Sequence, residues 1–436
     1  MSKQYQLGLN FPGLGRRKIE ANFEGGQVSS DGGVMLLRQA DRWLGLTKRL
    51  AQVLPDRRHP DLIQHPLESL LQQRIYGLAA GYEDLNDQDT LRKDLLWQTA
   101  TNRDELLGSS STLCRLENRA GRPEAIAIHQ VLFEQFVGGF GSPPQELILD
   151  FDCTDDPAHG QQIGRAFHGY YYDYCFLPLY VFCGEQLLVS YLRPSNIDSA
   201  KHAWAILALL VKALRRQWPE VKITLRADSG FCRWKLLRWC ERHQVSYVVG
   251  LAKNARLQAL SATLQQEAAE HYLATEQKAR LFGQFAYQAA SWDRPRQVIV
   301  KAEHHAQGAN PRFILTNLAA EAQFIYDQIY CARGEMENRI KEQQLGLFSD
   351  RTSCHAWWPN QFRLLLSSCA YVLMEAMRRF ALCGTELARA QVSTIRLKLF
   401  KIGAIITRNS RTIRIWFSSA FAYRNLFERC LAVFYG

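Results

Sequence analysis

The chain has 436 residues, of which 47% are hydrophobic, and carries a formal net charge of +11. This length predicts two or three structural units, and the chain has no apolar run long enough to span a bilayer, so no membrane partner is expected. The start MSKQYQLGLNFPGLGRRKIE lacks a signal-peptide core, and the eleven cysteines include no CxxC pair, so we expect a cytoplasmic protein.

The first 145 residues are electrically neutral and helical in pattern. They contain 17 basic and 17 acidic residues, and their apolar spacing predicts helices at residues 31–54, 66–81, 86–99 and 110–120. In the last of these, Arg115 and Arg119 lie four residues apart, as on a helix that reads the major groove of DNA; a polar surface helix fits the same pattern. The glycine-rich and proline-rich loop GGFGSPP ends this helical N-terminal domain.

Residues 146–375 alternate between strand and helix patterns. We predict a strand at 146–152, a strand pair at 177–192 and a helix at 199–217. A strand ending at Asp228, a helix at 233–244 and the strand SYVVGLA follow. From about 255 to 318 a helix and short strands interrupt this order as a small inserted subdomain. Trp292 within the insertion could stack on an unpaired base, although a lone tryptophan also fits a packed position.

Two of the predicted strands end in acidic residues. LILDFDCTDD and ITLRADSGF each read as a buried strand that delivers a carboxylate to a sheet edge. In the first, Asp150 and Asp152 lie on one face of the strand, and Asp152 is closer to its end. Asp228 has no rival in the second.

A third acid lies in YCARGEMENRIKEQQ, residues 330–344. At 100° per residue, its reactive side chains fall on one narrow helical face, whereas Glu335 and Glu342 point elsewhere. The residues on this face are Tyr330, Arg333, Glu337, Lys341 and Gln344. A carboxylate beside two cations suits a divalent metal held together with a phosphate.

At this point the chain resembles bacterial insertion-sequence transposases with a DDE triad on an RNase H-like core. Tyr330, Arg333 and Glu337 match the spacing of one large branch, and SSDGGVMLLRQADRWLGLTKRL and HGYYYDYCFLPLYVFCGEQLL are similar to the insertion-sequence family numbered 1380. Two further phrases, RIYGLAAGYEDLNDQDTLR and RGEMENRIKEQQLGLF, are similar to the same family. The branch often has a lysine where this chain has Gln344, so Lys341 is the candidate for that phosphate contact.

The resemblance implies an α/β fold: an RNase H-like mixed-sheet core, with the insertion, between the helical N-terminal domain and a basic tail. It implies Asp152, Asp228 and Glu337 as catalytic acids and metal ligands. Asp152 is preferred to Asp150 because Thr154 follows it by two residues, as in the family's first motif. Three carboxylates without histidine or cysteine ligands favour two Mg²⁺ ions, for which Mn²⁺ can substitute.

The implied function is cleavage at terminal inverted repeats and transfer of the 3′-OH ends into target DNA. A homodimer on paired double-stranded DNA ends is the family expectation, and residues 1–145 would bind those ends. The setting would be bacterial and nucleoid-associated. Two alternatives stay open: a structure-specific nuclease that does not join strands, and a non-catalytic DNA-binding protein.

The tail, residues 376–436, holds most of the excess positive charge. It has 11 basic and two acidic residues and no helical amphipathic pattern, which indicates nucleic acid rather than a membrane surface. TIRLKLFKIGAIIT and TIRIWFSS flank RNSR and read as two strands with a turn. The alternation places Arg396, Lys398 and Arg414 on the face predicted to contact DNA phosphates.

Overall fold

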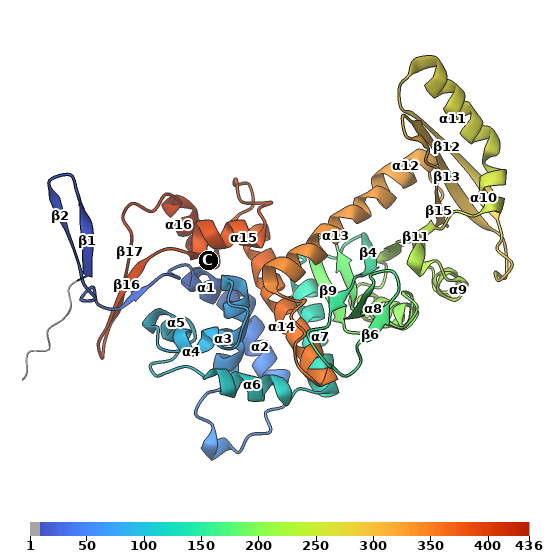
Figure 1. Ribbon diagram of the computed structural model, residues 1–436. Coiled ribbons are helices and arrows are strands. Elements are labelled where there is room, and N and C mark those ends of the chain that lie inside the picture. The colour runs from blue at the N-terminus through green and yellow to red at the C-terminus, as the bar shows by residue number, and fades with distance from the viewer. Residues whose placement is uncertain (1–8, 436) are drawn as a thin grey trace, which may run out of the picture. The chain divides into compact units, whose positions relative to one another are not determined.

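The computed structural model describes residues 9–435 (Figure 1). Residues 1–8 and residue 436 lie outside the described range. The chain forms two compact units. Unit 1 comprises Met1–Thr47, Arg58–Cys114 and Ala376–Gly436, and unit 2 comprises Lys48–Arg57 and Arg115–Glu375. The basic tail is therefore part of the same unit as the N-terminal helices, so the compact units divide the chain differently from the three predicted segments.

The predicted N-terminal helices are present, but two of them are broken. Gly45 adopts a left-handed conformation and ends the first helix, and residues between 91 and 95 interrupt the third. The helices are α1 (Val34–Leu44), α2 (Leu46–Val53), α3 (Leu67–Ala80), α4 (Asp87–Leu91), α5 (Leu95–Ala100) and α6 (Ser110–Asn118). A hairpin of β1 (Leu9–Leu14) and β2 (Arg17–Ala21) precedes them.

The first predicted strand of the tail is wrong in its N-terminal half. Residues 392–400 are helical, as α15 (Val392–Ile395) followed by a π turn. The reason is that Val392, Ile395 and Leu399 are fully buried at a spacing of three and four residues, which forms one helical face. The second half is a strand as predicted: β16 (Ala404–Arg408) pairs with β17 (Ile413–Phe417) and with β3 (Val28–Ser29), and α16 (Arg424–Tyr435) ends the chain.

One buried carboxylate connects the tail to the N-terminal part of unit 1. Asp31 is 1% exposed and accepts hydrogen bonds from the Tyr82 hydroxyl at 2.6 Å and from Trp97 Nε1 at 3.1 Å. Lys401 Nζ of the tail lies 2.6 Å from the same carboxylate. A buried carboxylate needs such partners because it has lost its hydration.

Unit 2 is built on a mixed sheet in which three central strands are parallel. The strands β4 (Glu146–Cys153), β10 (Lys222–Ala227) and β11 (Ser246–Leu251) run parallel, while β8 (Leu179–Cys183) and β9 (Gln186–Tyr191) extend the β4 edge antiparallel. With α8 (Ala203–Gln217) and α9 (Trp234–Arg242), the predicted chain order of strands and helices is confirmed. The helix α7 (Arg122–Gly138) was not predicted from the sequence.

The two faces of the sheet have different roles. Leu147, Leu149 and Phe151 of β4 are buried in the core that also contains α8 and α9. Asp150 and Asp152 alternate with them and therefore face the other side. On that side lie α13 (Gly334–Lys341) and the long helix α14 (Trp357–Ala376), whose Tyr371 ring contacts Phe182 of β8 at 5.6 Å.

The insertion continues the core sheet instead of forming a sheet of its own. Its strand β15 (Arg312–Thr316) pairs antiparallel with β11, so the free edge of β11 is used to extend the sheet. Two helices lie alongside its outer strands (Figure 1). Its other elements are α10 (Ala255–Leu260), α11 (Ala262–Thr275), β12 (Ala279–Tyr287), β13 (Arg296–His305) and β14 (Gly308–Ala309).

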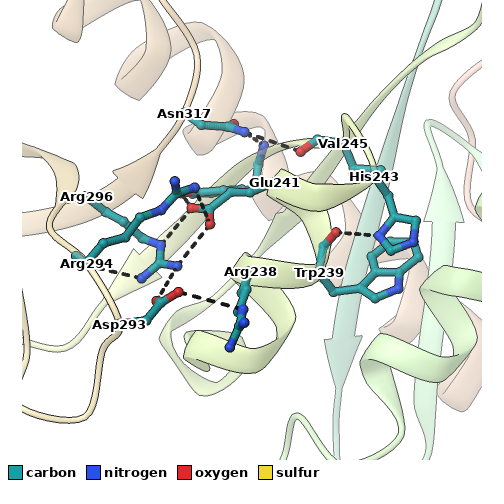
Figure 2. Close-up of polar contacts among 10 residues, drawn as sticks. Arg238, Trp239, Glu241, His243, Val245, Asp293, Arg294, Arg296 and Asn317 are labelled. Carbon is teal, nitrogen blue, oxygen red and sulfur yellow. Dashed lines mark hydrogen bonds and ion pairs between the residues drawn. The ribbon is translucent and has the colours of Figure 1, made fainter.

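A charged cluster joins the insertion to α9 (Figure 2). Glu241 of α9 accepts hydrogen bonds from Arg296 at 2.7 and 3.0 Å, and Arg294 lies 2.6 Å from the same carboxylate. Next to this cluster, Trp292 is 8% exposed and packs edge-on against Tyr287. The packed interpretation of Trp292 is therefore the correct one, and its ring does not present a face for base stacking.

Within residues 9–435, no helix is long and apolar enough to cross a membrane. Within the same residues, no disulfide joins any two of the eleven cysteines.

We predict that Asp31→Ala lowers the free energy of unfolding of unit 1 by roughly 3 kcal/mol, because it leaves the buried Trp97 N–H, the half-buried Tyr82 hydroxyl and the Lys401 ammonium without their acceptor. Urea unfolding followed by tryptophan fluorescence measures this, since Trp97 contacts Asp31. Asp61→Ala is the control, because the Asp61 side chain is 88% exposed. Equal shifts for the two variants would contradict the assigned role of Asp31.

Candidate active site

Two of the predicted acids lie at the same edge of the sheet. The strands β4 and β10 are parallel neighbours, with Asp150 opposite Arg226 and Phe151 opposite Ala227. Asp152 follows Phe151 and Asp228 follows Ala227, so the two carboxylates leave adjacent strand ends. Asp228 begins a short 3₁₀ turn and accepts a hydrogen bond from the Gly230 backbone N–H at 2.9 Å.

Asp150 and Asp152 have different partners although they share a face of β4. Asp150 is 2% exposed and forms a two-pronged ion pair with Arg226, in which Nη2 lies 2.7 Å from Oδ2. Arg226 also donates to the Ile329 carbonyl at 2.6 Å. Asp150 thus holds an arginine that fastens the chain just before Tyr330, and Asp152 is left to face the other acids.

The third acid reaches Asp152 through an arginine. Arg333 Nη1 donates to Asp152 Oδ2 at 3.0 Å, and its Nη2 donates to Glu337 Oε1 at 2.6 Å. The Arg333 guanidinium therefore lies between a strand-end carboxylate and a helix carboxylate. The predicted helical face is correct for Arg333 and Glu337, and Glu335 does not take part in these contacts.

The backbone of this helix is irregular. Helical conformation continues from α12 (Ala322–Phe324) through α13 to Gly346, but with π turns at Ile325–Tyr330 and Glu342–Gly346 and a 3₁₀ turn at Cys331–Arg333. Such irregular turns shift the register of side chains along a helix and are frequent at functional sites.

Tyr330 lies beside the second acid because a glycine leaves room for it. A Cβ atom on Gly250 would lie 2.7 Å from the Tyr330 hydroxyl and 2.8 Å from the Ser229 backbone nitrogen. Burial raises the pKa of Tyr330, Arg333 opposes this rise, and Asp228 adds to it. The phenol, Arg333 and Asp228 are thus close enough to influence one another's charge.

The site has more negative charge than its own cations balance. Burial raises the pKa of Asp152 to about 7; Arg333 opposes the rise, and the charges of Asp228 and Glu337 add to it. The Arg333 guanidinium pairs with only two of the three carboxylates, Asp152 and Glu337. A further cation at this place would stabilise their ionised forms.

The donor set suits a hard metal ion, but the carboxylates are not yet gathered around one. Carboxylate oxygens are the preferred ligands of Mg²⁺ and Mn²⁺. However, among residues 9–435 no three His, Cys, Asp or Glu side chains are close enough to hold an ion. Because Arg333 bridges Asp152 Oδ2 and Glu337 Oε1, a metal bound to these two oxygens would compete with its guanidinium.

The departure from the family pattern, Gln344, has a structural contact. Its Nε2 donates to the Asp155 carbonyl at 2.8 Å, which ties the end of the helix to the segment after Asp152. Lys341 is exposed at the end of α13. It remains the predicted phosphate contact.

The other predicted DNA contacts lie apart from the acids in the sequence, and the structure gives them different settings. Arg115 on α6 is exposed, and Arg119 is exposed in the turn that follows this helix. Arg414 is exposed on β17 as predicted. Lys398 is not on the predicted strand: it is half-buried in the helical turn Arg396–Phe400, and its Nζ lies 4.9 Å from the centre of the Tyr423 ring.

Arg396 does not have the predicted position. Its guanidinium donates to the carbonyls of Ala79 at 3.0 Å and Leu78 at 3.2 Å, at the C-terminal end of α3. A cation there satisfies carbonyls that the helix leaves without partners. Because residue 396 is helical and not in a strand, its side chain points into unit 1.

Two features of the site were missed from the sequence. The first is Arg226, which lies two residues before Asp228, just as Asp150 lies two residues before Asp152. A single arginine inside an otherwise apolar strand predicts a buried acidic partner, and this signal was available in the sequence. The second is an aromatic hairpin close to Asp152 in sequence, made by β6 (Ala166–His168) and β7 (Asp173–Phe176). The letters HGYYYDYCF show its rings but not their exposure.

Comparison with known proteins gives one strong match. No curated protein matches the chain. A cryo-EM structure of the piggyBac transposase synaptic complex with hairpin DNA is similar with a TM-score of 0.40 and 10% sequence identity, over 85% of this chain and 79% of that chain. A likeness this distant supports no inference. The family described as transposase DDE domain, group 1, matches residues 11–435, so the chain belongs to this family of DNA-binding recombination enzymes, which cleave DNA and transfer its strands.

Proposed function

We propose that this protein is the transposase of a bacterial insertion sequence, of the family numbered 1380. It cuts at the terminal inverted repeats and joins the freed 3′-OH ends to target DNA. The observation that carries the proposal is that Asp152 and Glu337 both accept hydrogen bonds from Arg333, while Asp228 lies at the end of the adjacent strand. The chain that contains these acids belongs to the DDE family. Family membership favours this function over a non-joining nuclease or a non-catalytic DNA-binding protein.

The proposed fold of the core is RNase H-like. The support is the order β9, β8, β4, β10, β11, in which the last three strands are parallel and the first two antiparallel. In this arrangement the first two acids leave neighbouring strand ends and the third is supplied by a helix lying on the sheet face.

DDE transposase domains generally depend on divalent metal ions. We assign the ligands as Asp152, Asp228 and Glu337, with two Mg²⁺ ions, or Mn²⁺ in their place, which when bound would activate the attacking oxygen and stabilise the leaving one. Asp150 is a positioning residue, because it acts through Arg226 on the backbone at Ile329. The attacking group is first water and then the 3′-OH of the element.

Arg333 has two roles in this proposal. Without metal and DNA, its guanidinium neutralises part of the charge of Asp152 and Glu337. In the complex it releases them and binds a phosphate, for which a guanidinium is well shaped. Tyr330 and Lys341 would contact the same strand.

The remaining contacts are proposed from charge and exposure. Arg115, Arg119, Lys398 and Arg414 would bind DNA backbone, with the N-terminal helices on the element's ends. Two copies would act together on paired ends, in the bacterial cytoplasm at the nucleoid.

The first prediction tests the acids. Asp152→Asn, Asp228→Asn and Glu337→Gln should each abolish cleavage and strand transfer with Mg²⁺, while mobility-shift binding of an end fragment persists. Glu335→Gln is the matched control, since Glu335 is an exposed acid two residues from Glu337. Full activity of Glu337→Gln with loss of activity in Glu335→Gln would contradict the assignment of the third acid.

The second prediction tests the competition between Arg333 and metal. Arg333→Ala should bind Mn²⁺ more tightly in the absence of DNA, by about tenfold or ~1.4 kcal/mol, because the carboxylates no longer have to release a guanidinium. Titration followed by the electron paramagnetic resonance of free Mn²⁺ measures this without any turnover.

Lys341→Ala is the control in that titration, because it removes a positive charge from the same helix at an exposed position. Unchanged or weaker Mn²⁺ binding by Arg333→Ala would mean that Arg333 holds the acids in place for the ion and does not compete with it.

The third prediction concerns the tail. Deleting residues 394–436 would remove Ile395, Leu399 and Phe400 from the core of unit 1, so point changes are the better test. Arg411 and Arg414 are both exposed near the β16–β17 turn. Changing both to glutamine should reduce the salt slope of DNA binding by up to ~1.8, at roughly 0.9 for each phosphate contact.

Arg424→Gln is the control for the tail, because Arg424 already pairs with Glu428 at 2.8 Å. Binding is measured by fluorescence anisotropy from low to moderate salt. If Arg411 and Arg414 can be changed with no effect on the slope, the tail does not contact DNA through this hairpin.

A further inference from the structure

Four aromatic rings are exposed on one small hairpin of unit 2. Phe167 and Tyr174 face each other across β6 and β7, with ring centres 5.7 Å apart, and are 52% and 49% exposed. Tyr170 and Tyr172 lie in the turn and are 80% and 83% exposed. We call residues 166–176 the aromatic hairpin. So many exposed rings on one element indicate a binding surface rather than a packing surface.

The base of the aromatic hairpin is firmly attached. Phe176 pairs with Asp156 of β5 (Asp156–Pro157), and the Ser195 hydroxyl donates to the Ala166 carbonyl at 2.6 Å. Just before the hairpin, Gly164 has a φ of 92°, and a Cβ at this position would collide with the Trp357 ring. The exposed rings are thus held out from a fixed frame.

The turn of the hairpin is itself constrained. The Tyr172 backbone N–H donates to the His168 carbonyl at 2.9 Å, and Tyr172 has a φ of 56°. A bulky residue in the left-handed region costs conformational energy, and such residues concentrate at functional sites. Tyr170 and Tyr171 make an edge-on pair with ring centres 5.0 Å apart. Arg165 lies 4.6 Å from the centre of the Tyr174 ring.

The hairpin begins close to the candidate active site. Asp156, which pairs with the end of the hairpin, lies four positions after Asp152, a span of at most ~14 Å of chain, and the hairpin extends about 10 Å further. Burial raises the pKa of the Tyr171 phenol, and the negative charges of Asp155 and Asp152 add to this rise. The two spans add up to about 24 Å. At 3.4 Å per nucleotide along one strand, the rings therefore lie within roughly seven nucleotides of a phosphate bound at Asp152.

We propose that the aromatic hairpin binds unpaired bases of the DNA end next to the cleavage site, by stacking them on the rings of Tyr170 and Tyr172. The proposal rests on the proposed function, since it needs a DNA end at Asp152. Every base has a flat face, so stacking on tyrosine requires no particular sequence. Where bases at the DNA end are unpaired, stacking on these rings would offset part of the cost of their unpairing.

The occupant that we favour is DNA rather than a second copy of the chain. The hairpin is attached within four residues of Asp152, where a strand of DNA has to pass during cleavage. Arg165 adds a positive charge to the ring surface, which suits a phosphate backbone. Trp292, the ring first considered for stacking, is buried and so leaves this hairpin as the exposed aromatic surface near the acids.

The test measures how removal of the tyrosine rings and removal of the DNA bases, separately and together, change the affinity for DNA. Tyr170→Ala and Tyr172→Ala are made in the Glu337→Gln background, so that binding is measured without cleavage. The probe is an end fragment from the DNA flanking the gene, with its last seven nucleotides unpaired on one strand. A second probe has abasic sites at those seven positions and the same number of phosphates. Anisotropy at fixed salt gives the affinities.

We expect each alanine variant to bind the first probe about 5- to 150-fold more weakly, the range for the loss of one stacked base. The abasic probe should bind wild type and variants alike. Tyr170→Phe and Tyr172→Phe keep the ring and should bind normally. Trp204→Ala, which removes a 53% exposed ring from α8, should have no effect on either probe.

Two results would overturn the proposal. If the alanine variants lose the same affinity for both probes, the tyrosines contact the backbone and not the bases. If they bind both probes normally but change from dimer to monomer in sedimentation, the hairpin contacts a second copy of the chain. Failure of the proposed function would be seen separately, as absence of cleavage and joining by the unaltered protein with Mg²⁺.

Discussion

The charge on strand β4 is the constraint on which the active-site region depends. Asp150 and Asp152 are both largely buried on one face of this strand, and a buried carboxylate is costly unless a cation or hydrogen-bond donors replace its hydration. Arg226 from the neighbouring strand serves Asp150, and Arg333 from the helix serves Asp152. Arg226 also donates a hydrogen bond to the Ile329 carbonyl. The arginine that neutralises Asp150 therefore also positions the helical segment that carries Glu337.

The site was largely predictable because its parts are local. Strand alternation places both aspartates on one face, and helical spacing groups Arg333 with Glu337, so each half could be derived within its own segment. The contacts between strand β4 and the helical segment that carries Arg333 and Glu337 could not be derived. Arg226 is 76 residues from Asp150, and Arg333 is 181 residues from Asp152. These long-range pairs decide which aspartate faces the other acids, and one sequence does not reveal them.

The tail and the insertion show two other limits of sequence reasoning. Around Arg396 the short alternation of charged and apolar residues competed with a helical spacing of Val392, Ile395 and Leu399, and burial of these three in unit 1 decided for the helix. The charge of the tail was counted correctly, but Arg396 and Lys401 use theirs inside the fold. Similarly, the insertion strands were recognised, whereas the pairing of β15 with β11 is non-local and so has no sequence signal.

In the structure, Arg333 contacts Asp152 and Glu337, and in the proposed reaction it would contact a DNA phosphate. Asp152 and Glu337 share one guanidinium, which offsets part of the repulsion among the three carboxylates. The same guanidinium prefers phosphate geometry when a phosphate is offered. Under the proposed function, DNA would give Arg333 a new partner and leave Asp152 and Glu337 free for metal ions. Under the proposed function, metal and DNA would therefore bind cooperatively, because each removes the obstacle to the other, and hydrolysis away from the correct DNA end would be disfavoured.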